Sequence, residues 1–574
     1  MRTFPLFADK ILLALSFFIS FSCKQKNAAT EPNTDEWYKN QLIYNLDIDS
    51  FKDSDADGTG DFKGLISRLD YLKSLGVDII WLSPFQPSPD KDDGYDVTDY
   101  YGIDKRLGNI QDYRAFIKEA KKRDLRVIMD LALNHTSIEH PWFKESRKDS
   151  SFYHNWYVWS DVRPKDWNKG MGFPKVEKET WTRDSISGRY YFHRFYTFQP
   201  DLNYEEPLVV KESIKIIKYW LDLGMDGFRL DAVPFIIDLP KTGSEKTEND
   251  FKVLNEITAF VHRYKPEAIL LGEANVEPEE NKKYFGEKGN RLNMMFNFYA
   301  NQYLFYGMAS SNIKAFKQAL KDTREKPGKS QWAYFLRNHD EIDLGRLSKQ
   351  DRNLVYSKFG PDTTMQLYDR GIRRRLAPML GNNPQHLRLA YSLLFSLPGT
   401  PVLRYGEELG MGDDLSLKER LAVRTPMQWS DSVNAGFSAA PKTFRPVIAL
   451  GQYGYPQLNV KTQTADTASL LNFVKKLVAL RRKCPEIGNG EWEVLDTGTD
   501  HVLAILYKGG GSALLTIHNF SDKPEQVSLK DVISTDKQYL DLFSGKTEAL
   551  ATDRKIDFKL AAHNFKWYKI KRLE

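Results

Sequence analysis

The stretch GFRLDAV, residues 227–233, places two charged side chains inside a segment that is otherwise apolar or glycine. The apolar members of the stretch are typical of a buried strand. Burying Arg229 and Asp231 there costs free energy unless the two groups are paired or take part in chemistry. A structural ion pair in a core is one interpretation and a functional site is the other, and the rest of the chain decides between them.

Seven further apolar segments of this kind occur along the chain, separated by amphipathic helical stretches. They are LIYNLDIDSF (42–51), VDIIWLSPF (77–85), RVIMDLALNH (126–135), AILLGEA (268–274), LNMMFNF (292–298), QWAYFLRNHD (331–340) and VLRYGEEL (402–409). Nearly continuous apolar strands that alternate with helices indicate a parallel sheet covered on both faces. Eight such strands predict an α/β fold, the (β/α)8 or TIM barrel.

Two regions depart from this alternation. Residues 136–198 are aromatic, rich in turns and too long for a simple connection, which predicts an inserted lid lobe after the third strand. From residue 486 onward apolar and polar residues alternate, as in HVLAILYKG, which is typical of antiparallel strands. We therefore expect a catalytic barrel over 37–135 and 199–485, and a C-terminal antiparallel β-sandwich domain over 486–574.

The N-terminal residues are not expected to belong to the barrel. The apolar run ILLALSFFISFS (11–22) follows Arg2 and Lys10, and its 12 residues are too few to span a bilayer, so residues 1–22 indicate a signal peptide. Because Cys23 follows directly, as in a bacterial lipoprotein, we expect an exported protein with a lipid anchor on Cys23 and a linker over 23–36. Ordinary secretion and a cytoplasmic location are the alternatives.

The composition excludes some classes of partner. Of 574 residues, 41% are hydrophobic and 28% are charged, which is typical of a soluble globular protein. The net charge of +5 is spread along the chain without a block of Lys and Arg, so we expect no nucleic-acid partner. Cys484 is the only other cysteine, so we expect no internal disulfide. The sequence leaves open whether the chain forms an oligomer.

Polar and charged side chains gather at the carboxyl ends of the expected strands, where the active site of such a barrel lies. Three carboxylates, Asp231, Glu273 and Asp340, come from three different strand ends. Because uncompensated carboxylates repel one another, a purely structural role explains the set poorly. Two carboxylates about 5–5.5 Å apart at the anomeric carbon of a sugar perform retaining glycosidic bond chemistry, one as nucleophile and one as general acid and base.

At these residues the sequence resembles the α-amylase family of retaining glycosidases and transglycosylases, glycoside hydrolase family 13. The motifs DLALNH, QPDLN, GFRLDAV, GEA and RNHDE occur in the family's order, and the resemblance extends from about residue 37 to the C-terminus. It implies that Asp231 is the nucleophile, that Glu273 is the general acid and base, and that Asp340 stabilises the transition state by holding substrate hydroxyls.

The resemblance also implies which residues bind the sugar. Arg229 would keep Asp231 ionised and oriented, and the sugar-binding residues would include His135, Gln199 and His339.

Other segments are similar to the trehalose-forming branch of this family. They are GYDVTDY (94–100), HPWFKESR (140–147), GIRRRLAPMLGNN (371–383), VRTPMQWS (423–430) and YGYPQLNV (453–460). This similarity implies that Asp96 and Arg420 clamp the far side of the non-reducing glucose, with Arg424 assisting. An ion pair unrelated to substrate is the alternative for Asp96 and Arg420.

The reaction implied by this branch is a rearrangement of maltose into trehalose. Asp231 displaces glucose, which turns over in a closed pocket and attacks the glucosyl-enzyme, while attack by water gives glucose as a side product. Two features favour a different reading: the expected export, and Arg404 with Glu407 where the family usually shows an aromatic residue and Asp. Arg404 at the end of its strand would alter the floor of the pocket or its charge.

Two alternative functions follow. An exported α-glucosidase or α-amylase-like hydrolase would act on maltose or short α-glucans. A non-catalytic sugar-binding protein on the same barrel would be expected to lose members of the acid triad, and this chain keeps Asp231, Glu273 and Asp340.

Two segments suggest calcium. DSDADGTGD (53–61) alternates oxygen-bearing side chains around a tight turn, as Ca²⁺ requires, and lacks the final Glu of an EF-hand. A solvated acidic turn without metal is the alternative. By similarity to the family's first-strand loop, the ligands would be Asp53, Asp55, Asp57, the Thr59 carbonyl and Asp61. A second calcium site would use Asn134, Asp201, Asp238 and the carbonyls of Phe235 and Ile236.

Overall fold

The computed structural model describes residues 34–238, 251–530, 537–549 and 555–572. The expected signal peptide, Cys23 with its lipid anchor and most of the expected linker lie outside these ranges. Within the described ranges, no helix is both long enough and apolar enough to cross a membrane.

Eight parallel strands close into a barrel, which confirms the predicted (β/α)8 fold. Around the barrel they follow the order β1, β14, β10, β9, β8, β7, β3 and β2. Their bounds are β1 (Ile43–Leu46), β2 (Ile79–Leu82), β3 (Arg126–Leu131), β7 (Gly227–Leu230), β8 (Ile269–Gly272), β9 (Met294–Phe296), β10 (Gln331–Phe335) and β14 (Thr400–Arg404). Each strand overlaps one of the eight segments expected from the sequence.

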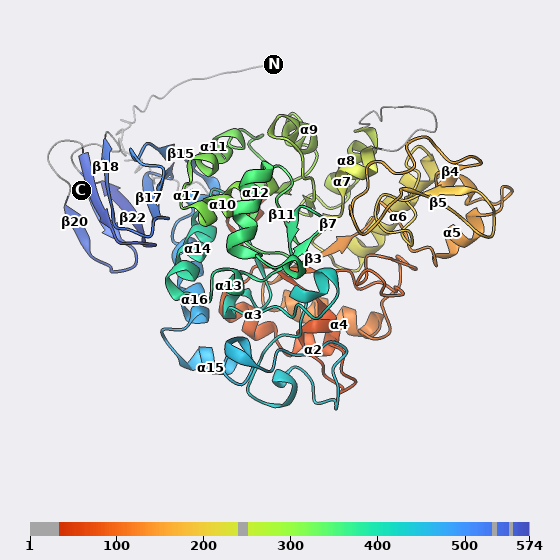
Figure 1. The fold of residues 1–574 in the computed structure, drawn as a ribbon, viewed down its shortest axis with the longest axis horizontal. Helices are drawn as coiled ribbons and strands as arrows, with labels where there is room; N and C mark the ends of the chain where they lie inside the picture. Colours follow the sequence, from red (N-terminus) through yellow and green to blue (C-terminus); the bar gives the residue numbers. More distant parts are fainter. Residues whose placement is uncertain (1–33, 239–250, 531–536, 550–554, 573–574) are drawn as a thin grey trace, which may run out of the picture. The chain divides into compact units, whose positions relative to one another are not determined.

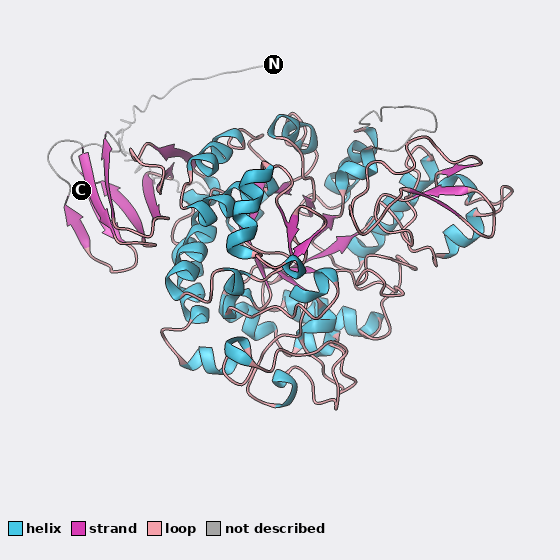
Figure 2. Ribbon diagram, in the orientation of Figure 1, coloured by secondary structure: helices cyan, strands magenta, loops and turns pink. Residues whose placement is uncertain are grey.

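Helices surround these strands, as the cyan elements around the central magenta strands show (Figure 2). They are α1 (Ile48–Phe51), α2 (Phe62–Ile66), α3 (Leu69–Leu75), α4 (Ile110–Lys121), α6 (Pro207–Asp222), α7 (Val233–Ile237), α8 (Lys252–Tyr264), α9 (Asn281–Phe285), α10 (Phe298–Ser310), α11 (Lys314–Asp322), α12 (Lys349–Phe359), α13 (Leu376–Met379), α14 (Pro384–Ser396), α15 (Val460–Ala465) and α16 (Leu470–Arg482). In α4, Asn109 and Asp112 cap the first turn reciprocally, and the face that carries Tyr113 and Phe116 is buried.

Short 3₁₀ helices complete the connections between these elements. They are η1 (Thr34–Asn40), η2 (His154–Trp156), η3 (Pro278–Glu280), η4 (Thr363–Met365), η5 (Glu407–Leu409), η6 (Glu419–Val423), η7 (Val433–Gly436) and η8 (Gly451–Tyr453).

Two small antiparallel sheets are inserted in the barrel sequence. In the expected lid lobe, after α5 (Pro141–Ser146), the strands β4 (Trp159–Ser160), β5 (Trp181–Arg183) and β6 (Tyr190–Phe192) pair in the order β4, β6, β5. After β10, the strands β11 (Ile342–Asp343), β12 (Gln366–Leu367) and β13 (Gly371–Ile372) pair in the order β11, β13, β12. Neither sheet is predicted from the sequence, because strands of two or three residues leave no periodic pattern.

The last part of the chain is antiparallel, as predicted, and follows α17 (Glu486–Asn489); its strands are drawn in blue in Figure 1. Six strands form one sheet in the order β15 (Glu491–Leu495), β16 (Val502–Gly509), β17 (Ser512–Asn519), β22 (Phe565–Arg572), β19 (Lys537–Asp541) and β20 (Thr547–Ala549). β18 (Glu525–Lys530) pairs with β21 (Lys555–Leu560). Apolar side chains of both sheets, such as Leu506, Val527 and Phe558, form a separate core. The exact limits of this domain and of the lid lobe stay predictions.

Candidate active site

A pocket of about 410 Å³ lies at the carboxyl ends of the barrel strands. Asp231 follows β7, Glu273 follows β8 and Asp340 follows β10, and all three side chains line this pocket. Its volume falls in the range of roughly 300–1,000 Å³ that is usual for small-molecule sites. The structure thus brings together the three carboxylates expected to perform the chemistry, while their individual roles stay predictions.

One buried guanidinium contacts four groups around this cluster. Arg229 has a side chain that is only 1% exposed, and it contacts Asp130 at 2.7 Å, Asp231 at 2.5 Å and Glu273 at 2.9 Å. The fourth group is the aromatic ring of Trp81, whose centroid lies 5.6 Å from the guanidinium carbon. Because three carboxylates surround this one cation, the cost of burying it is offset. Arg229 and Asp231 of GFRLDAV therefore form an ion pair at the pocket.

The backbone around Asp231 is unusual at both ends. A Cβ on Gly227 would lie 2.1 Å from the carbonyl oxygen of Ile269, so β7 can approach β8 this closely only with glycine. After Asp231 the chain turns sharply, because Ala232 has a φ of 48°, a left-handed value that non-glycine residues rarely adopt. In this conformation the Ala232 N–H donates a hydrogen bond of 3.0 Å to Glu273 Oε2. The residue that follows the expected nucleophile therefore positions the expected acid and base.

Burial raises the pKa values of both carboxyls that Arg229 bridges. The pKa of Asp231 is raised to about 6, since burial and the charges of Asp130 and Asp340 outweigh Arg229. The pKa of Glu273 is raised to about 7, again mainly by burial, with the charges of Asp231 and Asp340 adding to it. Near pH 7 Asp231 is therefore mostly ionised, while Glu273 is substantially protonated. A nucleophile and a general acid require this division of roles.

Two arginines and a histidine hold Asp340 in its ionised form. Arg420 lies 2.9 Å, Arg424 3.0 Å and His339 3.1 Å from its carboxylate oxygens. Burial alone would raise the pKa of Asp340, but these three neighbours hold it well below its usual range. The third carboxylate of the pocket is thus a permanent anion that can accept hydrogen bonds from sugar hydroxyls.

The two expected sugar-binding histidines occupy different places. His135 lines the pocket, and its Nε2 lies 3.2 Å from the carbonyl oxygen of Tyr95. His339 is not among the lining residues; its Nε2 contacts the Tyr95 hydroxyl at 2.7 Å and Asp340 at 3.1 Å. Burial lowers the pKa of each ring to about 4, so both are neutral near pH 7.

The expected pairing of Asp96 with Arg420 is wrong. The Asp96 carboxylate accepts hydrogen bonds from the Ser88 hydroxyl at 2.7 Å and from two backbone N–H groups of the same loop at 3.2 Å. Asp96 therefore stabilises the conformation of its own loop, and it does not line the pocket. Asp92 lines the pocket and forms the ion pair with Arg420. Both acids belong to DDGYD (92–96), and only the folded loop shows which of them faces the pocket.

Two other expected substrate-binding residues act behind the pocket wall. Gln199 donates a hydrogen bond of 2.8 Å to Asp92 Oδ2. Arg424 contacts Asp340 at 3.0 Å and Asp93 at 2.6 Å. Since neither side chain lines the pocket, each is placed to position a carboxylate that does.

Arg404 does not form the floor of the pocket, contrary to expectation. Its side chain is 1% exposed, forms an ion pair with Asp47 and donates a hydrogen bond of 2.7 Å to Asn45. The second departure from the family, Glu407, lies 3.1 Å from Arg375. Both unusual charges are therefore buried in ion pairs, and neither side chain lines the pocket.

Aromatic side chains that the sequence did not single out as pocket residues form much of the wall. The aromatic lining consists of Tyr95, Phe173, Phe195, Phe235 and Phe298. Phe173 comes from the expected lid lobe and packs on Tyr196 and Tyr368, with ring centroids 4.7 Å and 4.5 Å away. The hydroxyls of Tyr196 and Tyr368 both contact Glu419. We call Phe173, Tyr196 and Tyr368 the lid cluster, because they join the lobe to the segment that follows β10.

The remaining lining residues that the sequence analysis did not name are mostly polar. They are Asp92, Met171, Gly172, Ala232, Pro234, Asn275, Asn338, Glu341, Asp343, Arg346 and Arg370. Asn338 stands at the end of an expected strand, whereas the others lie on loops or in elements of two to five residues, where no periodic signal exists.

The motif GIRRRLAPMLGNN (371–383) supports this wall from behind. Arg373 donates hydrogen bonds to the carbonyls of Leu415 at 2.8 Å and of Leu417 and Glu419 at 2.7 Å each. These carbonyls lie directly before Arg420. The motif that distinguishes the trehalose-forming branch therefore fixes the segment that carries one of the two pocket arginines.

The expected first calcium loop folds as a tight turn. Carboxylate oxygens of Asp53, Asp55 and Asp61 lie within 4.8 Å of one another. Gly58 has a φ of 98°, and a Cβ there would lie 2.4 Å from the Lys442 carbonyl oxygen, so the turn requires glycine. Three hard oxygen donors in a turn of this kind fit Ca²⁺.

Two carboxylates of the expected second calcium site have buried oxygens without a partner in the described part of the chain. Asp201 Oδ2 and Asp238 Oδ1 are both buried, and neither has a hydrogen-bond partner among the described residues. Burial raises the pKa of Asp201 to about 7, partly offset by Arg194 and Asn134. Buried carboxylate oxygens without partners are costly, and a bound cation would satisfy them.

Known proteins resemble this chain along most of its length. The chain matches the alpha amylase catalytic domain over residues 45–371 and 363–490. It is 38% identical to a trehalose synthase of Pimelobacter sp. (strain R48) over 93% of this chain and 96% of that protein. It is 39% identical to a trehalose synthase/amylase of Mycobacterium tuberculosis over 88% and 85%. An oligo-1,6-glucosidase of Parageobacillus thermoglucosidasius is 31% identical over 87% and 92%.

A solved structure agrees with the fold. The trehalulose synthase MutB of Pseudomonas mesoacidophila MX-45 superposes with a TM-score of 0.74 at 26% identity, covering 93% of this chain and 99% of that one.

Proposed function

The chain belongs to the alpha-amylase family, and we propose that it converts maltose into trehalose by moving a glucosyl unit within one substrate molecule. The observation that carries the proposal is its similarity to trehalose synthases, which extends along almost the whole chain and exceeds its similarity to the oligo-1,6-glucosidase. The substrate is a small sugar, and the reaction retains configuration through a covalent intermediate.

The first step breaks the bond between the two glucose rings. An ionised Asp231 oxygen attacks C1 of the non-reducing ring, and the bond from C1 to the bridging oxygen breaks. Glu273 gives its proton to that oxygen, so free glucose and a glucosyl-Asp231 ester are formed. The raised pKa of Glu273 supports its role as the acid, and the hydrogen bond from the Ala232 N–H holds its carboxyl group in place. Asp340 holds hydroxyls of the reacting ring, and Asp92 with Arg420 binds its far side.

The second step forms trehalose. The released glucose turns over, and its anomeric hydroxyl attacks C1 of the glucosyl-enzyme while Glu273 takes the proton. The ester bond to Asp231 breaks, so configuration at C1 is retained and no water is consumed. If water attacks in place of glucose, the product is glucose instead of trehalose. The lid cluster supports the proposal, because it packs the lobe against the segment after β10 beside the pocket and so limits access of water.

Calcium is part of the proposal. Asp53, Asp55, Asp57, the Thr59 carbonyl and Asp61 would hold one ion in the first loop, and the convergence of three of these carboxylates supports it. Asn134, Asp201, Asp238 and the carbonyls of Phe235 and Ile236 would hold a second, and two unpartnered carboxylate oxygens support that site. Such ions would stabilise loops that border the pocket and would take no part in bond breaking.

We further propose that the protein is exported and anchored through a lipid on Cys23. The apolar run that directly precedes this cysteine supports export. Replacement by Cys23→Ser should move the protein from the membrane fraction to the soluble fraction of expressing bacteria. Equal membrane association of both proteins would reject the anchor.

Product analysis with the full-length protein tests the function. With maltose and Ca²⁺, we expect trehalose to accumulate ahead of glucose in a time course followed by NMR. Asp231→Asn should lower turnover by at least about 10⁴-fold without changing the thermal unfolding midpoint greatly, since Asn has the same shape. Glucose as the only early product would support the hydrolase alternative. A parent protein that binds maltose without turning it over, and that binds it equally well as Asp231→Asn, would support the sugar-binding alternative.

A further inference from the structure

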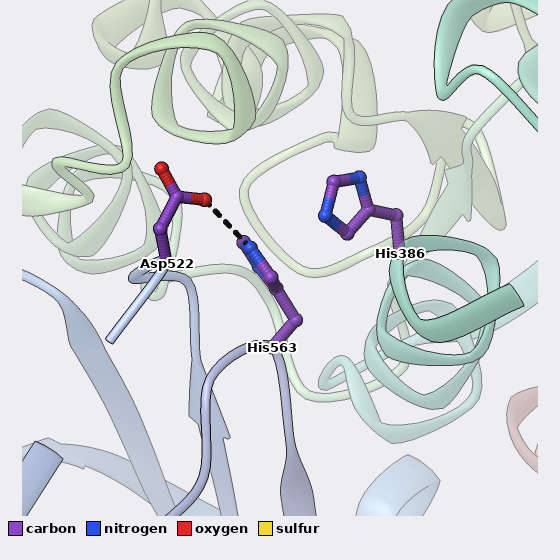
Figure 3. Close-up of side chains that lie close together, drawn as sticks. All are labelled: His386, Asp522 and His563. Atoms are coloured by element: carbon purple, nitrogen blue, oxygen red, sulfur yellow. Dashed lines mark hydrogen bonds and ion pairs between the residues drawn. The ribbon is translucent and has the colours of Figure 1, made fainter. Parts of the chain in front are cut away.

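A second group of side chains that can bind a ligand lies outside the catalytic pocket. His386 lies on α14, Asp522 follows β17, and His563 lies in the turn between β21 and β22. Figure 3 shows the three side chains converging from these separate segments. One nitrogen or oxygen of each lies within 4.8 Å of those of the other two. None of the three lines the catalytic pocket, so the group is independent of the proposed reaction.

The cluster lies where a barrel helix meets the C-terminal domain. Ser392 on α14 contacts His518 Nε2 of β17 at 3.0 Å and accepts a hydrogen bond of 3.0 Å from Trp567 of β22. α14 is thus already fixed against the same sheet whose turns carry Asp522 and His563. A ligand held by all three residues would tie the two parts together at one more point.

Hydrogen bonding within the protein accounts for the positions of only two of the three side chains. His563 Nε2 lies 2.7 Å from Asp522 Oδ1, which accounts for one imidazole and the carboxylate. The second imidazole, that of His386, lies with its ring centroid 4.1 Å from that of His563 and makes no hydrogen bond to any residue of the described ranges. His563 also has a φ of 48°, a left-handed backbone that histidine adopts rarely. Strained residues of this kind tend to occur where a side chain must be held in place for function.

The donor set identifies the class of ligand. Two imidazoles and a carboxylate form a set that binds zinc and related divalent transition metals, with a fourth position left for water. Donors bound to one tetrahedral zinc at about 2.0–2.1 Å lie about 3.3 Å apart. In the cluster one pair of donors lies 2.7 Å apart and every pair lies within 4.8 Å, so the donors are close enough to share one ion. Calcium prefers oxygen donors, which separates this site from the acidic loops.

A cavity gives a metal ion access to the cluster. A cavity of about 260 Å³ is lined by His386, Asp522 and His563 together with apolar side chains such as Met308 and Leu380. Asp522 is 81% exposed, so one ligand already faces solvent. An ion can therefore reach the cluster without any rearrangement of the domains.

We propose that His386, Asp522 and His563 bind one zinc-like divalent transition-metal ion that joins α14 to the C-terminal domain. The ion bridges the two parts of the chain and makes no contact with substrate. Its removal therefore loosens this junction and leaves maltose turnover at low temperature unchanged.

Cobalt is a suitable probe, because its absorption bands report tetrahedral coordination directly. Full-length protein is stripped with a chelator, saturated with Ca²⁺ and titrated with Co²⁺, which Zn²⁺ then displaces. We expect one equivalent of Co²⁺ to bind with visible bands, and Zn²⁺ to raise the thermal unfolding midpoint. His386→Ala and His563→Ala should each weaken binding by about tenfold or more, since even outer neighbours of metal sites contribute 10- to 100-fold.

His154→Ala is the matched control, because His154 also lies near a carboxylate, 3.8 Å from Asp149, but has no second histidine partner of this kind. This variant should keep the Co²⁺ bands, and maltose turnover by all three variants shows that each is folded. Absence of tetrahedral bands in the parent protein, or equal Co²⁺ affinity in the His386→Ala, His563→Ala and His154→Ala proteins, would overturn the proposal.

Discussion

Arg229 contacts Asp130, Asp231 and Glu273 at the same time, and it is the only cation in direct contact with the last two among the described residues. A guanidinium does not lose its proton in proteins, so its charge is constant across the physiological pH range. One positive charge cannot fully stabilise three buried anions, and burial therefore still raises the pKa values of Asp231 and Glu273. The protonation state of the site consequently changes between about pH 6 and pH 7, where both pKa values lie.

This charge balance predicts a bell-shaped pH dependence. As the pH rises through about 6, Asp231 loses its proton and becomes a nucleophile, so kcat/KM increases. As the pH rises through about 7, Glu273 loses the proton that it must donate, so kcat/KM decreases. Steady-state kinetics from pH 5 to pH 9 check this, and Glu273→Gln should remove the alkaline limb from the residual activity. A profile that is flat between about pH 6 and pH 8 would contradict the assignment.

Two neighbouring acids should differ sharply in their effect. Asp92→Asn removes the charge that pairs with Arg420 in the pocket, so we expect kcat/KM to fall by about 100-fold or more. Asp96→Asn affects only hydrogen bonds within the loop, so we expect mainly a lower unfolding temperature. Kinetics and thermal unfolding of both variants make the comparison. A larger loss of kcat/KM from Asp96→Asn would restore the role that the sequence suggested for Asp96.

At the scale of elements, the wall of the pocket is assembled from segments that are distant in sequence. The lobe contributes Phe173, the segment between β12 and β13 contributes Arg370, and η6 contributes Arg420. The guanidinium of Arg420 lies 4.8 Å from the Phe173 ring centroid, so the lobe also contacts the charged end of the pocket. The proposed balance between transfer and hydrolysis depends on how well these contacts exclude water.

Opening this wall should favour water as the acceptor. Phe173→Ala removes the ring that packs on Tyr196 and Tyr368, so we expect the ratio of glucose to trehalose to rise several-fold while cleavage of maltose continues. Phe152→Ala is the control, because Phe152 belongs to the same lobe but is 64% exposed. NMR product ratios at early times measure the effect. An unchanged ratio in Phe173→Ala would show that the lid cluster does not govern access of water.

The sequence predicted the elements better than their contacts. Eight apolar segments gave the barrel, because burial on both faces leaves a long apolar run in each strand. The three catalytic candidates followed, since strand ends determine which side of a barrel a residue faces. Asp92 and Arg404 could not be placed, because loop conformation and the choice of an ion-pair partner depend on the folded chain. The short strands β11, β12 and β13 left no pattern at all.

At the scale of the whole molecule, the barrel and the antiparallel domain are joined along α14 and α16. Lys476 on α16 donates a hydrogen bond of 3.2 Å to the Phe543 carbonyl of the antiparallel domain, and Trp567 of β22 donates one of 3.0 Å to Ser392 on α14. The catalytic pocket lies at the carboxyl ends of the barrel strands and shares no lining residue with the cavity at this junction. Loss of the ion proposed at the junction should therefore lower stability there without changing catalysis.

Calcium should stabilise the whole barrel if the acidic turn binds it. At a free concentration 100-fold above Kd, one bound ion adds about 2.7 kcal/mol to the free energy of unfolding. Removal with a chelator should therefore lower the unfolding temperature by several degrees, and Asp55→Asn should abolish this difference for the first loop. Asp431→Asn, an exposed aspartate paired with Lys461, is the control. An unfolding temperature that does not change with calcium would leave the turn as a solvated acidic loop.

In the proposed reaction, the glucose released from maltose stays in the pocket until it is joined again. Maltose labelled with ¹³C only in its reducing ring, incubated with the full-length protein and an excess of unlabelled glucose, shows whether it does. We predict that early trehalose carries the label in one of its two rings in nearly every molecule, because the acceptor never leaves the pocket. Trehalose that is mainly unlabelled would show exchange with free glucose, and labelled glucose without trehalose would show a hydrolase; either result would contradict the claim.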